Sequence, residues 1–193
     1  MNMKNTIIIL FISIQSLFTS QSFGQEMNFD TNSSKIKWYG KEFSGKQHYG
    51  SLSLTKAEIK MKDGLIIGGT FIVNMKSLNV QDLTGEWKEK LEGHLRSDDF
   101  FSVEKFNTAK LIIEKSVLLK DGTHEINGQL TIKGITLPTT FKLYTNNDGA
   151  EAKMIFDRSK YDVRFRSGNF FENLGDKLIY DDIEMDVTLN VKK

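Results

Sequence analysis

The segment "IYDDIEMDVTLNV", Ile179 to Val191, shows the pattern that decides the fold. From residue 183 onward every second residue is apolar, and the residues between them are acidic, hydroxyl or amide side chains. Successive side chains of an extended strand point to opposite faces, so this period of two predicts a long antiparallel strand with one buried and one wet face. Asp182, Glu184 and Asp186 then lie on the wet face of a strand and do not form a calcium loop.

The same alternation recurs along the chain after residue 25 and predicts about eight strands. The expected strand segments are KIKWYG, HYGSLSL, AEIKM, GGTFIV, HEINGQLTIK, TFKLYT, AEAKMIFD and YDVRFR. Asp-Gly pairs at 63–64, 121–122 and 148–149 favour tight hairpins between them. Because closure removes exposed strand edges, we predict an all-β fold with one helix, arranged as a closed antiparallel β-barrel. A two-sheet sandwich is the structural alternative.

One stretch, "DLTGEWKEKLEGHLRSDDFF", departs from this pattern. Its apolar residues recur every four positions: Leu83, Trp87, Leu91 and Leu95. This spacing predicts an amphipathic helix, with Asp82 as its N-cap. Two glycines weaken the helix, so we expect it to depend on docking Trp87 and Leu91 onto the barrel. We expect the chain to re-enter the sheet at Phe100-Phe101, with one ring of the pair lining the interior.

The first 24 residues have the features of a signal peptide. Lys4 supplies a positive start, IIILFISI supplies an apolar core, and Ser22 and Gly24 are small residues that a signal peptidase accepts. The apolar run is much shorter than the ~20 residues of a spanning helix, which favours cleavage near Gly24 over a membrane anchor. We therefore expect an exported protein, in a periplasm or outside the cell, with one domain over residues 25–193.

Charge and cysteine content argue against several classes of protein. Without residues 1–24 the chain carries 25 basic and 25 acidic residues, which gives no electrostatic case for nucleic acid or an anionic membrane surface. No cysteine is present, so the domain has no disulfides and no lipidated cysteine. Its stability must come from a core alone.

The sequence holds little that points to an enzyme. It contains no G-x-S-x-G elbow, P-loop, dinucleotide fingerprint or H-E-x-x-H motif. The histidines, at 48, 94 and 124, are too dispersed for a local metal motif, and we expect no metal. The strongest catalytic alternative is a hydrolase-like site formed by Ser159, Asp157 and His48, with Arg158 beside them. The preferred interpretation of Asp157-Arg158-Ser159 is an ion pair that closes a strand end.

Small residues alternate with large apolar ones on the expected inward faces: Gly50, Ala57, Gly69, Ala109, Gly128 and Ala152. A barrel of about eight strands is just wide enough to be filled by side chains or to hold one small ligand. Small residues favour a cavity, although the taper of a barrel also calls for them. His48 shares the inward row and is either a core histidine or a contact for a ligand head group. His94, near the helix end, either meets a polar head or, as we prefer, caps carbonyls of the helix C-terminus.

Five motifs carry a resemblance to a known family: SKIKWYGKEFSGKQHYG, GHLRSDDFF, GQLTIKGIT, FDRSKYDV and DKLIYDDIEMDVTL. In order and spacing they resemble the YceI-like family of lipid- and polyisoprenoid-binding proteins, over about Asp30 to Val191. The resemblance implies an extended lipocalin-like barrel, a helix packed against it, and an elongated apolar pocket for a long-chain amphiphile. It also implies a bacterial, exported protein that is not an enzyme. The chain departs from the family pattern at Asn107 and at Tyr161-Asp162.

These observations together predict a non-enzymatic protein that sequesters or carries a polyisoprenoid or fatty-chain amphiphile in an apolar tunnel. The alternative is an enzyme that acts on a small lipid or polar substrate inside the barrel. The expected partner is the lipid itself, with no other cofactor, no nucleic acid and no stable membrane insertion after signal removal; a homodimer is left open. The expected tunnel lining is Trp38, His48, Leu52, Phe71, Trp87, Leu91, Phe100, Phe101, Leu130, Phe141, Met154, Phe156, Phe165, Phe170 and Met185.

Overall fold

The computed structural model of the protein describes residues 24–192. The expected signal peptide, residues 1–24, lies outside the described residues except for Gly24 and stays a prediction. The strands are β1 (Gln25–Asn28), β2 (Lys35–Lys41), β3 (Gln47–Lys62), β4 (Leu65–Val80), β5 (Thr108–Leu118), β6 (His124–Ile132), β7 (Ile135–Thr145), β8 (Gly149–Asp157) and β9 (Asp182–Asn190). One α-helix, α1 (Gly85–Arg96), and two short 3₁₀ turns, η1 (Arg158–Tyr161) and η2 (Gly175–Lys177), complete these elements.

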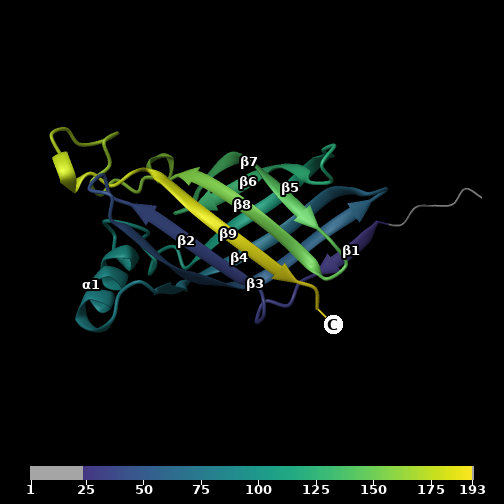
Figure 1. Ribbon diagram of the computed structural model, residues 1–193, viewed down its shortest axis with the longest axis horizontal. Helices are drawn as coiled ribbons and strands as arrows, with labels where there is room; N and C mark the ends of the chain where they lie inside the picture. Colours follow the sequence, from purple (N-terminus) through teal and green to yellow (C-terminus); the bar gives the residue numbers. More distant parts are fainter. Residues whose placement is uncertain (1–23, 193) are drawn as a thin grey trace, which may run out of the picture.

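The strands close into an antiparallel barrel, which confirms the predicted fold and excludes the sandwich (Figure 1). Pairings run in the order β3-β2-β9-β8-β7-β6-β5-β4, and β4 pairs back onto β3. β1 lies in line with β2 in the barrel wall. It pairs with the second half of β3, whereas β2 pairs with the first half, and Phe29, just after β1, bridges to Val191, just after β9. The wall therefore has eight strand positions, one of which is built from two short strands.

Tight hairpins, one at each end of the barrel, follow from residues with positive φ. Asp63 and Gly64 join β3 to β4 with φ of 51° and 76°, as the Asp-Gly pair predicts. Lys133 and Gly134 join β6 to β7 with φ of 50° and 76°, a hairpin that the sequence analysis did not predict. Both turns have the geometry whose twist matches that of the strands they connect.

The long strand β3 merges two segments that the sequence suggested were separate. β3 contains both HYGSLSL and AEIKM in one run of 16 residues. A register shift between Leu54 and Lys56 moves the inward face from even to odd positions, so that Leu54, Ala57 and Ile59 are all buried. Such bulges let one strand continue around the strongly curved wall of the barrel.

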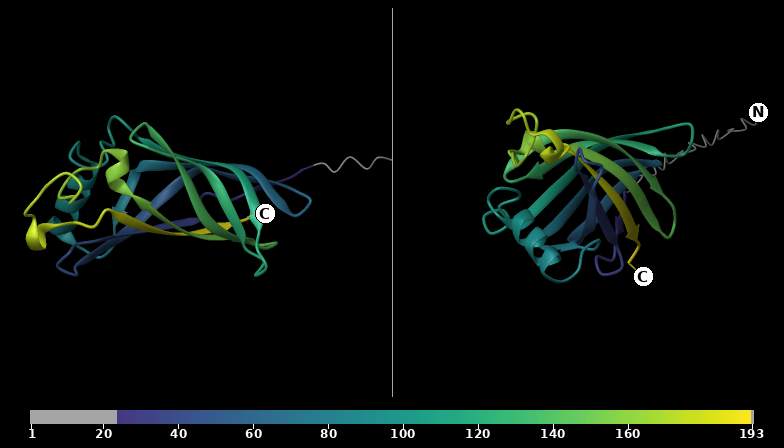
Figure 2. Two further views of the ribbon diagram at one scale, coloured as in Figure 1. Left: turned by 90° about the horizontal axis from the view of Figure 1, so that it is seen from above. Right: turned by 60° about the vertical axis from the view of Figure 1, so that its left-hand side comes forward.

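The end of the barrel opposite α1 (Figures 1 and 2) holds a large cluster of buried apolar side chains. The core cluster there is formed by Phe29, Ile36, Leu54, Ala57, Ile59, Ile66, Phe71, Ile113, Ile126, Phe141, Leu143, Ala150 and Leu189. Ile59 and Ile126 are completely buried. Apolar side chains therefore close this end, and the barrel opens toward the helix.

Helix α1 lies at the open end, but it begins at Gly85 and not near Asp82. Its N-cap is Thr84, whose side chain makes no capping hydrogen bond. Leu95 is buried and Leu91 half-buried against β4, whereas Trp87 is 71% exposed, so the expectation that Trp87 docks on the barrel is wrong. Leu83, which precedes the helix, packs against the same cluster as Leu91 and Leu95 and completes the docking face.

Two segments expected to be strands are turns. Phe100 and Phe101 lie in a series of turns after α1, so the backbone does not direct their rings to opposite faces. The two rings contact each other, with centroids 5.2 Å apart. YDVRFR is not a strand either: η1 takes up its start, and the chain then forms the loop that leads to β9. This loop and α1 lie together at the open end (Figure 2).

Candidate ligand-binding site

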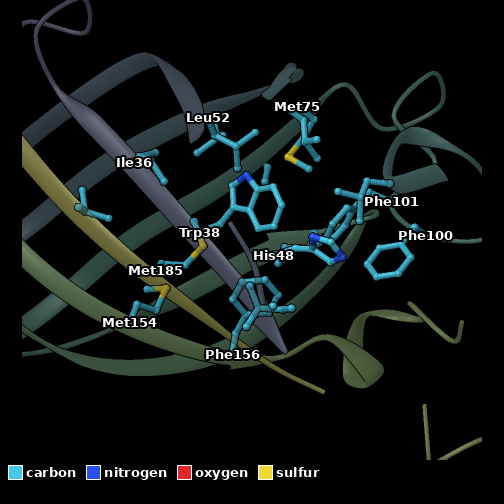
Figure 3. Close-up of a pocket in the computed structure, with 18 of the residues that line it drawn as sticks. Ile36, Trp38, His48, Leu52, Met75, Phe100, Phe101, Met154, Phe156 and Met185 are labelled. Carbon is cyan, nitrogen blue, oxygen red and sulfur yellow. The ribbon is translucent and has the colours of Figure 1, made fainter. Parts of the chain in front are cut away.

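The centre of the barrel is hollow. A cavity of ≈ 470 Å³ runs between the strands and is lined mainly by apolar side chains (Figure 3). Inward residues such as Met154, Met185 and Val187 are only partly buried although they lie inside the wall, because the cavity separates them from the opposite strands. The volume lies within the range of small-molecule sites in proteins. The arrangement can hold an apolar chain.

Most residues expected to line the tunnel do lie on its wall: Trp38, His48, Leu52, Phe71, Trp87, Leu91, Phe100, Phe101, Leu130, Phe141, Met154, Phe156, Phe165 and Met185. In Figure 3 Met154 and Met185 lie toward one end of the view, with Trp38 and His48 between them and the pair Phe100-Phe101. Trp87 belongs to the rim, as its exposure shows. Whether these side chains contact a ligand stays a prediction.

Phe170 does not line the cavity, and its assignment to the tunnel is wrong. Its ring is 42% exposed and stacks under the guanidinium of Arg164, with 5.0 Å between Cζ and the ring centroid. The amides of both Phe170 and Phe171 donate to the carbonyl of Ser167, which folds this stretch into a turn on the outside. The extended backbone assumed for the pair is therefore absent.

The small inward residues act in two different ways. Ala109 and Ala152 line the cavity, as expected for residues that leave space. Gly50, Gly69 and Gly128 instead allow close approach of neighbouring groups. A Cβ at Gly69 would lie 2.9 Å from the carbonyl oxygen of Glu58, and one at Gly128 would collide with the carbonyl oxygen of Ile112. These glycines serve the curvature of the wall and do not create the hollow.

His48 lies at the mouth and is held by Asp82. The Nδ1 of His48 lies 2.7 Å from Oδ2 of Asp82, whose Oδ1 accepts the backbone N–H of Tyr49 at 3.0 Å. Burial acts to raise the pKa of Asp82, but these two hydrogen bonds and the charge of the imidazole outweigh it and leave that pKa below 3.8. The ionised carboxylate accepts from Nδ1–H of His48.

His94 does not cap the helix, contrary to the preferred interpretation. The amide of Ser97 donates to the carbonyls of Gly93 and His94, and its hydroxyl donates to the latter at 2.7 Å. The imidazole of His94 instead packs edge-on against Phe165, with ring centroids 4.2 Å apart, and lines the cavity. Its Nε2 is buried without a hydrogen-bond partner among the described residues. Burial lowers the pKa of His94, so the ring is neutral at neutral pH.

Asp157-Arg158-Ser159 is a structural clamp. The fully buried Arg158 donates to the carbonyl oxygens of Val163 (3.0 Å), Ile179 (3.1 Å) and Tyr180 (3.3 Å), and its Nη2 lies 3.1 Å from Oδ1 of Asp181. It thus ties η1 to both ends of the loop before β9.

The structure does not assemble the catalytic alternative. Ser159 donates its hydroxyl to Asp157 Oδ1 at 2.6 Å and accepts from the amide of Asn169 at 3.0 Å. His48 is bound to Asp82 and not to Asp157. The three residues therefore lack the serine–histidine hydrogen bond that a triad needs. Within residues 24–192, no group of three or more His, Asp or Glu side chains is placed to hold a metal ion.

Several lining residues were missed by the sequence analysis. Met75, Val73 and Val187 share inward rows with residues that were identified, so extending the alternation would have found them. Lys46 and Arg166 also line the cavity, but both lie in turns, where no alternation applies. No helix within residues 24–192 has the length and apolar character needed to cross a bilayer.

Comparison with known sequences supports the resemblance given by the motifs. Residues 27–191 match the family model described as the YceI-like domain. A UPF0312 protein of Shewanella denitrificans is 32% identical over 75 residues, and one of Pseudomonas putida is 36% identical over 58 residues. These alignments span 39% and 30%, respectively, of both this chain and the relative.

Solved structures share the fold at low sequence identity. BcnA of Burkholderia cenocepacia superposes with a TM-score of 0.65 at 16% identity, covering 86% of this chain and 99% of BcnA. A polyisoprenoid-binding domain from Saccharophagus degradans, implicated in plant cell wall breakdown, gives 0.56 at 10% identity, over 86% and 97% of the two chains. The YCEI protein of Campylobacter jejuni gives 0.53 at 14% identity, over 99% of each.

Proposed function

Because the chain belongs to the YceI-like domain family, we propose that it binds a long-chain amphiphile of polyisoprenoid or fatty-chain type inside its barrel. The polyisoprenoid-binding domain of Saccharophagus degradans, which shares the fold, supports a lipid ligand of this kind. The amphiphile is held without covalent change, as the separation of His48 from Ser159 favours. The role is to sequester or carry the lipid after export to the periplasm, in line with the apolar segment of residues 7–14.

The observation that carries this proposal is the hollow, apolar centre of the barrel. A cavity of ≈ 470 Å³ continues from the mouth beside α1 down to the packed end. Each methylene that leaves water for such a site contributes about 0.8 kcal/mol, so a chain of some ten methylenes retains several kcal/mol after its ordering cost. The tail supplies the affinity.

The wall is suited to a branched or irregular tail. Met75, Met154 and Met185 line the cavity, and a methionine side chain adapts its shape through three rotatable bonds. Isoprene methyl groups and unbranched chains can therefore be accommodated by the same wall. We expect weak discrimination among tails of similar volume.

Native mass spectrometry of the full chain tests this function. Protein purified without added lipid is measured first, and then after delipidation and incubation with geranylgeraniol or palmitate. We expect a bound apolar molecule in the first sample or uptake of one added lipid at a ratio of one to one in the second. Protein that is empty as purified and takes up neither lipid would overturn the proposal. A screen for turnover of the same lipids checks the non-enzymatic role, and a product that depends on Ser159 would contradict it.

A further inference from the structure

Exposed aromatic side chains gather at the open end of the barrel. Six aromatic residues are exposed within residues 24–192, and five of them, here called the aromatic rim, lie at this end: Phe43, Trp87, Phe170, Phe171 and Tyr180. They come from the β2–β3 turn, from α1 and from the loop before β9, which meet at the left-hand end of Figure 1. The sixth, Tyr144, lies near the end of β7, at the opposite end of the barrel. Exposed apolar groups that gather in this way mark a surface for contact with another body.

Two rings of the rim are fixed to each other through the backbone. Phe43 and Tyr180 have ring centroids 6.1 Å apart. The N–H of Phe43 donates to the carbonyl of Leu178 at 2.8 Å, and the N–H of Tyr180 donates to the carbonyl of Lys41 at 2.9 Å. These bonds join the β2–β3 turn to the loop before β9 and hold both rings in solvent, where their apolar surface is unfavourable until a partner covers it.

The other rings of the rim lie on supported turns or beside cations. The N–H of Phe171 donates to the carbonyl of Ser167, a fully buried residue whose hydroxyl is bonded to Asp181. Phe170 lies under the guanidinium of Arg164, and Nζ of Lys90 lies 5.2 Å from the ring centroid of Trp87. An aromatic ring beside a long cationic side chain combines an apolar body with a charge that can stay in water, and this combination is typical of residues at the surface of a bilayer.

The aromatic rim surrounds the entrance to the cavity. Trp87 is 71% exposed and also lines the cavity, so its indole reaches from the mouth into solvent. Glu42 and Ile179, the chain neighbours of Phe43 and Tyr180, line the cavity as well and form a β-bridge with each other. A surface that covered the rim would therefore also cover the mouth.

Charge does not supply the attraction. The chain has 26 basic and 25 acidic residues, and at the mouth Lys41 is paired with Glu184 at 2.6 Å and Lys90 with Glu86 at 3.1 Å. Contact made by the rim must therefore come from its rings. Aromatic side chains favour the polar–apolar boundary of a bilayer without a need for anionic lipid.

We infer that the open end of the barrel docks reversibly on the interface of a phospholipid bilayer, with the aromatic rim in the head-group region and the mouth facing the membrane. The inference rests on the proposed function for the cargo and adds the bilayer as its source or destination. An apolar tail can then pass between the bilayer and the cavity without crossing water, which removes the largest obstacle to its transfer. The opposite end, closed by the buried apolar cluster, offers no such path.

The test measures co-sedimentation with phosphatidylcholine vesicles, using protein expressed with its own residues 1–24 and purified after export. Phe43→Ser/Phe171→Ser removes two rings of the rim that do not line the cavity, and it should raise the lipid concentration at half-binding about tenfold or more. The matched control, Ile67→Ser/Tyr144→Ser, removes two side chains of similar exposure at the closed end and should change that concentration by less than about twofold. Both double variants should take up geranylgeraniol as the parent protein does.

Other outcomes separate docking from charge, from self-association and from the proposed function. Binding that requires phosphatidylglycerol, or that about tenfold more salt abolishes, would assign the contact to charge and overturn the docking by rings. A dimer that Phe43→Ser/Phe171→Ser dissociates, in a protein that does not bind vesicles, would make the rim an interface between two copies and overturn the inference. Uptake of geranylgeraniol without vesicle binding overturns the docking alone. Vesicle binding without uptake of any lipid overturns the proposed function and leaves the docking standing.

Trp87 gives a readout that does not depend on the serine variants. The chain has two tryptophans, Trp87 at the rim and Trp38, which is only 8% exposed inside the barrel. Brominated acyl chains quench an indole that they contact, so vesicles of brominated phosphatidylcholine should quench the parent protein much more than Trp87→Phe, which keeps only Trp38. Equal quenching of the two proteins would show lipid inside the barrel without a docked rim and would contradict the inference.

Discussion

The indole ring of Trp38 lies on the backbone of Gly50, its partner across the β2–β3 pairing. A Cβ at position 50 would lie 2.6 Å from Cζ2 of Trp38 and would collide with the carbonyl oxygen of Asn79. Glycine is therefore required here for packing, while its φ is ordinary. The absence of a side chain at Gly50 leaves room for the indole between β3 and the cavity.

We predict that Gly50→Ala lowers the free energy of unfolding by about 2–3 kcal/mol, because a backbone oxygen and a large buried ring must both move. Urea unfolding followed by circular dichroism measures this change. The displaced indole should also enter the cavity and weaken lipid binding. Stability within about 0.5 kcal/mol of the parent protein would show that the wall yields more easily than the contact implies.

Gly93 gives the opposite prediction. It lies in the interior of α1, where an added methyl group would meet no atom within 4 Å outside its own helix, and its backbone is not in the left-handed region. Gly93→Ala should therefore raise the free energy of unfolding by about 0.5–1 kcal/mol, since alanine loses less conformational entropy in a helix. Urea unfolding followed by circular dichroism measures this change as well. A destabilised variant would mean that α1 requires a flexible point.

The hydrogen bonds and ion pair of Arg158 should be essential for the stability of the loop at the open end. Arg158→Met removes the charge opposite Asp181 and leaves the carbonyls of Val163, Ile179 and Tyr180 without their donor. We expect a loss of about 3–5 kcal/mol in the free energy of unfolding, as for other broken buried ion pairs. Hydrogen exchange should accelerate most in residues 163–181.

Ser159→Ala is the neighbouring control for the clamp. It removes one hydroxyl bonded to Asp157 and Asn169, so we expect a loss of about 1 kcal/mol and no change in lipid affinity. If Arg158→Met and Ser159→Ala were equally stable, the buried arginine would not be the residue that holds the loop.

The alternation in the sequence predicted the barrel because the direction of a side chain along a strand is a local property of extended backbone. The predictions for individual side chains failed where contacts outside the local pattern determine the structure. Asp82 is not an N-cap because its carboxylate is taken by Tyr49 and His48, some 33 and 34 residues away. Phe170 faces outward because the carbonyl of Ser167 folds the chain into a turn. For Arg166, a left-handed backbone at an arginine has no sequence signature, so its position in the cavity lining could not be anticipated.

Asp82 should make the open end sensitive to acid. Its pKa is lowered in the folded protein, so its contribution to stability is present above the unfolded value of 3.8 and is lost as the pH falls through the lower folded value. Asp82→Asn, which cannot ionise, should therefore flatten the dependence of stability on pH below about 4. Urea unfolding at pH 7, 4 and 3 measures this. Parallel pH curves for the two proteins would show that the pairing with His48 and Tyr49 contributes little.

Filling the cavity should weaken lipid binding strongly without harming the fold. Ala152 lines the cavity, whereas Ile155, three residues along β8, is 60% exposed on the outer face. Ala152→Phe places a ring where the tail lies and should weaken lipid binding at least about tenfold, while the matched Ile155→Phe leaves it unchanged. In a Trp87→Phe background Trp38 is the only tryptophan, and its fluorescence reports lipid at the cavity wall. Equal titration curves for the two variants would place the lipid outside the barrel.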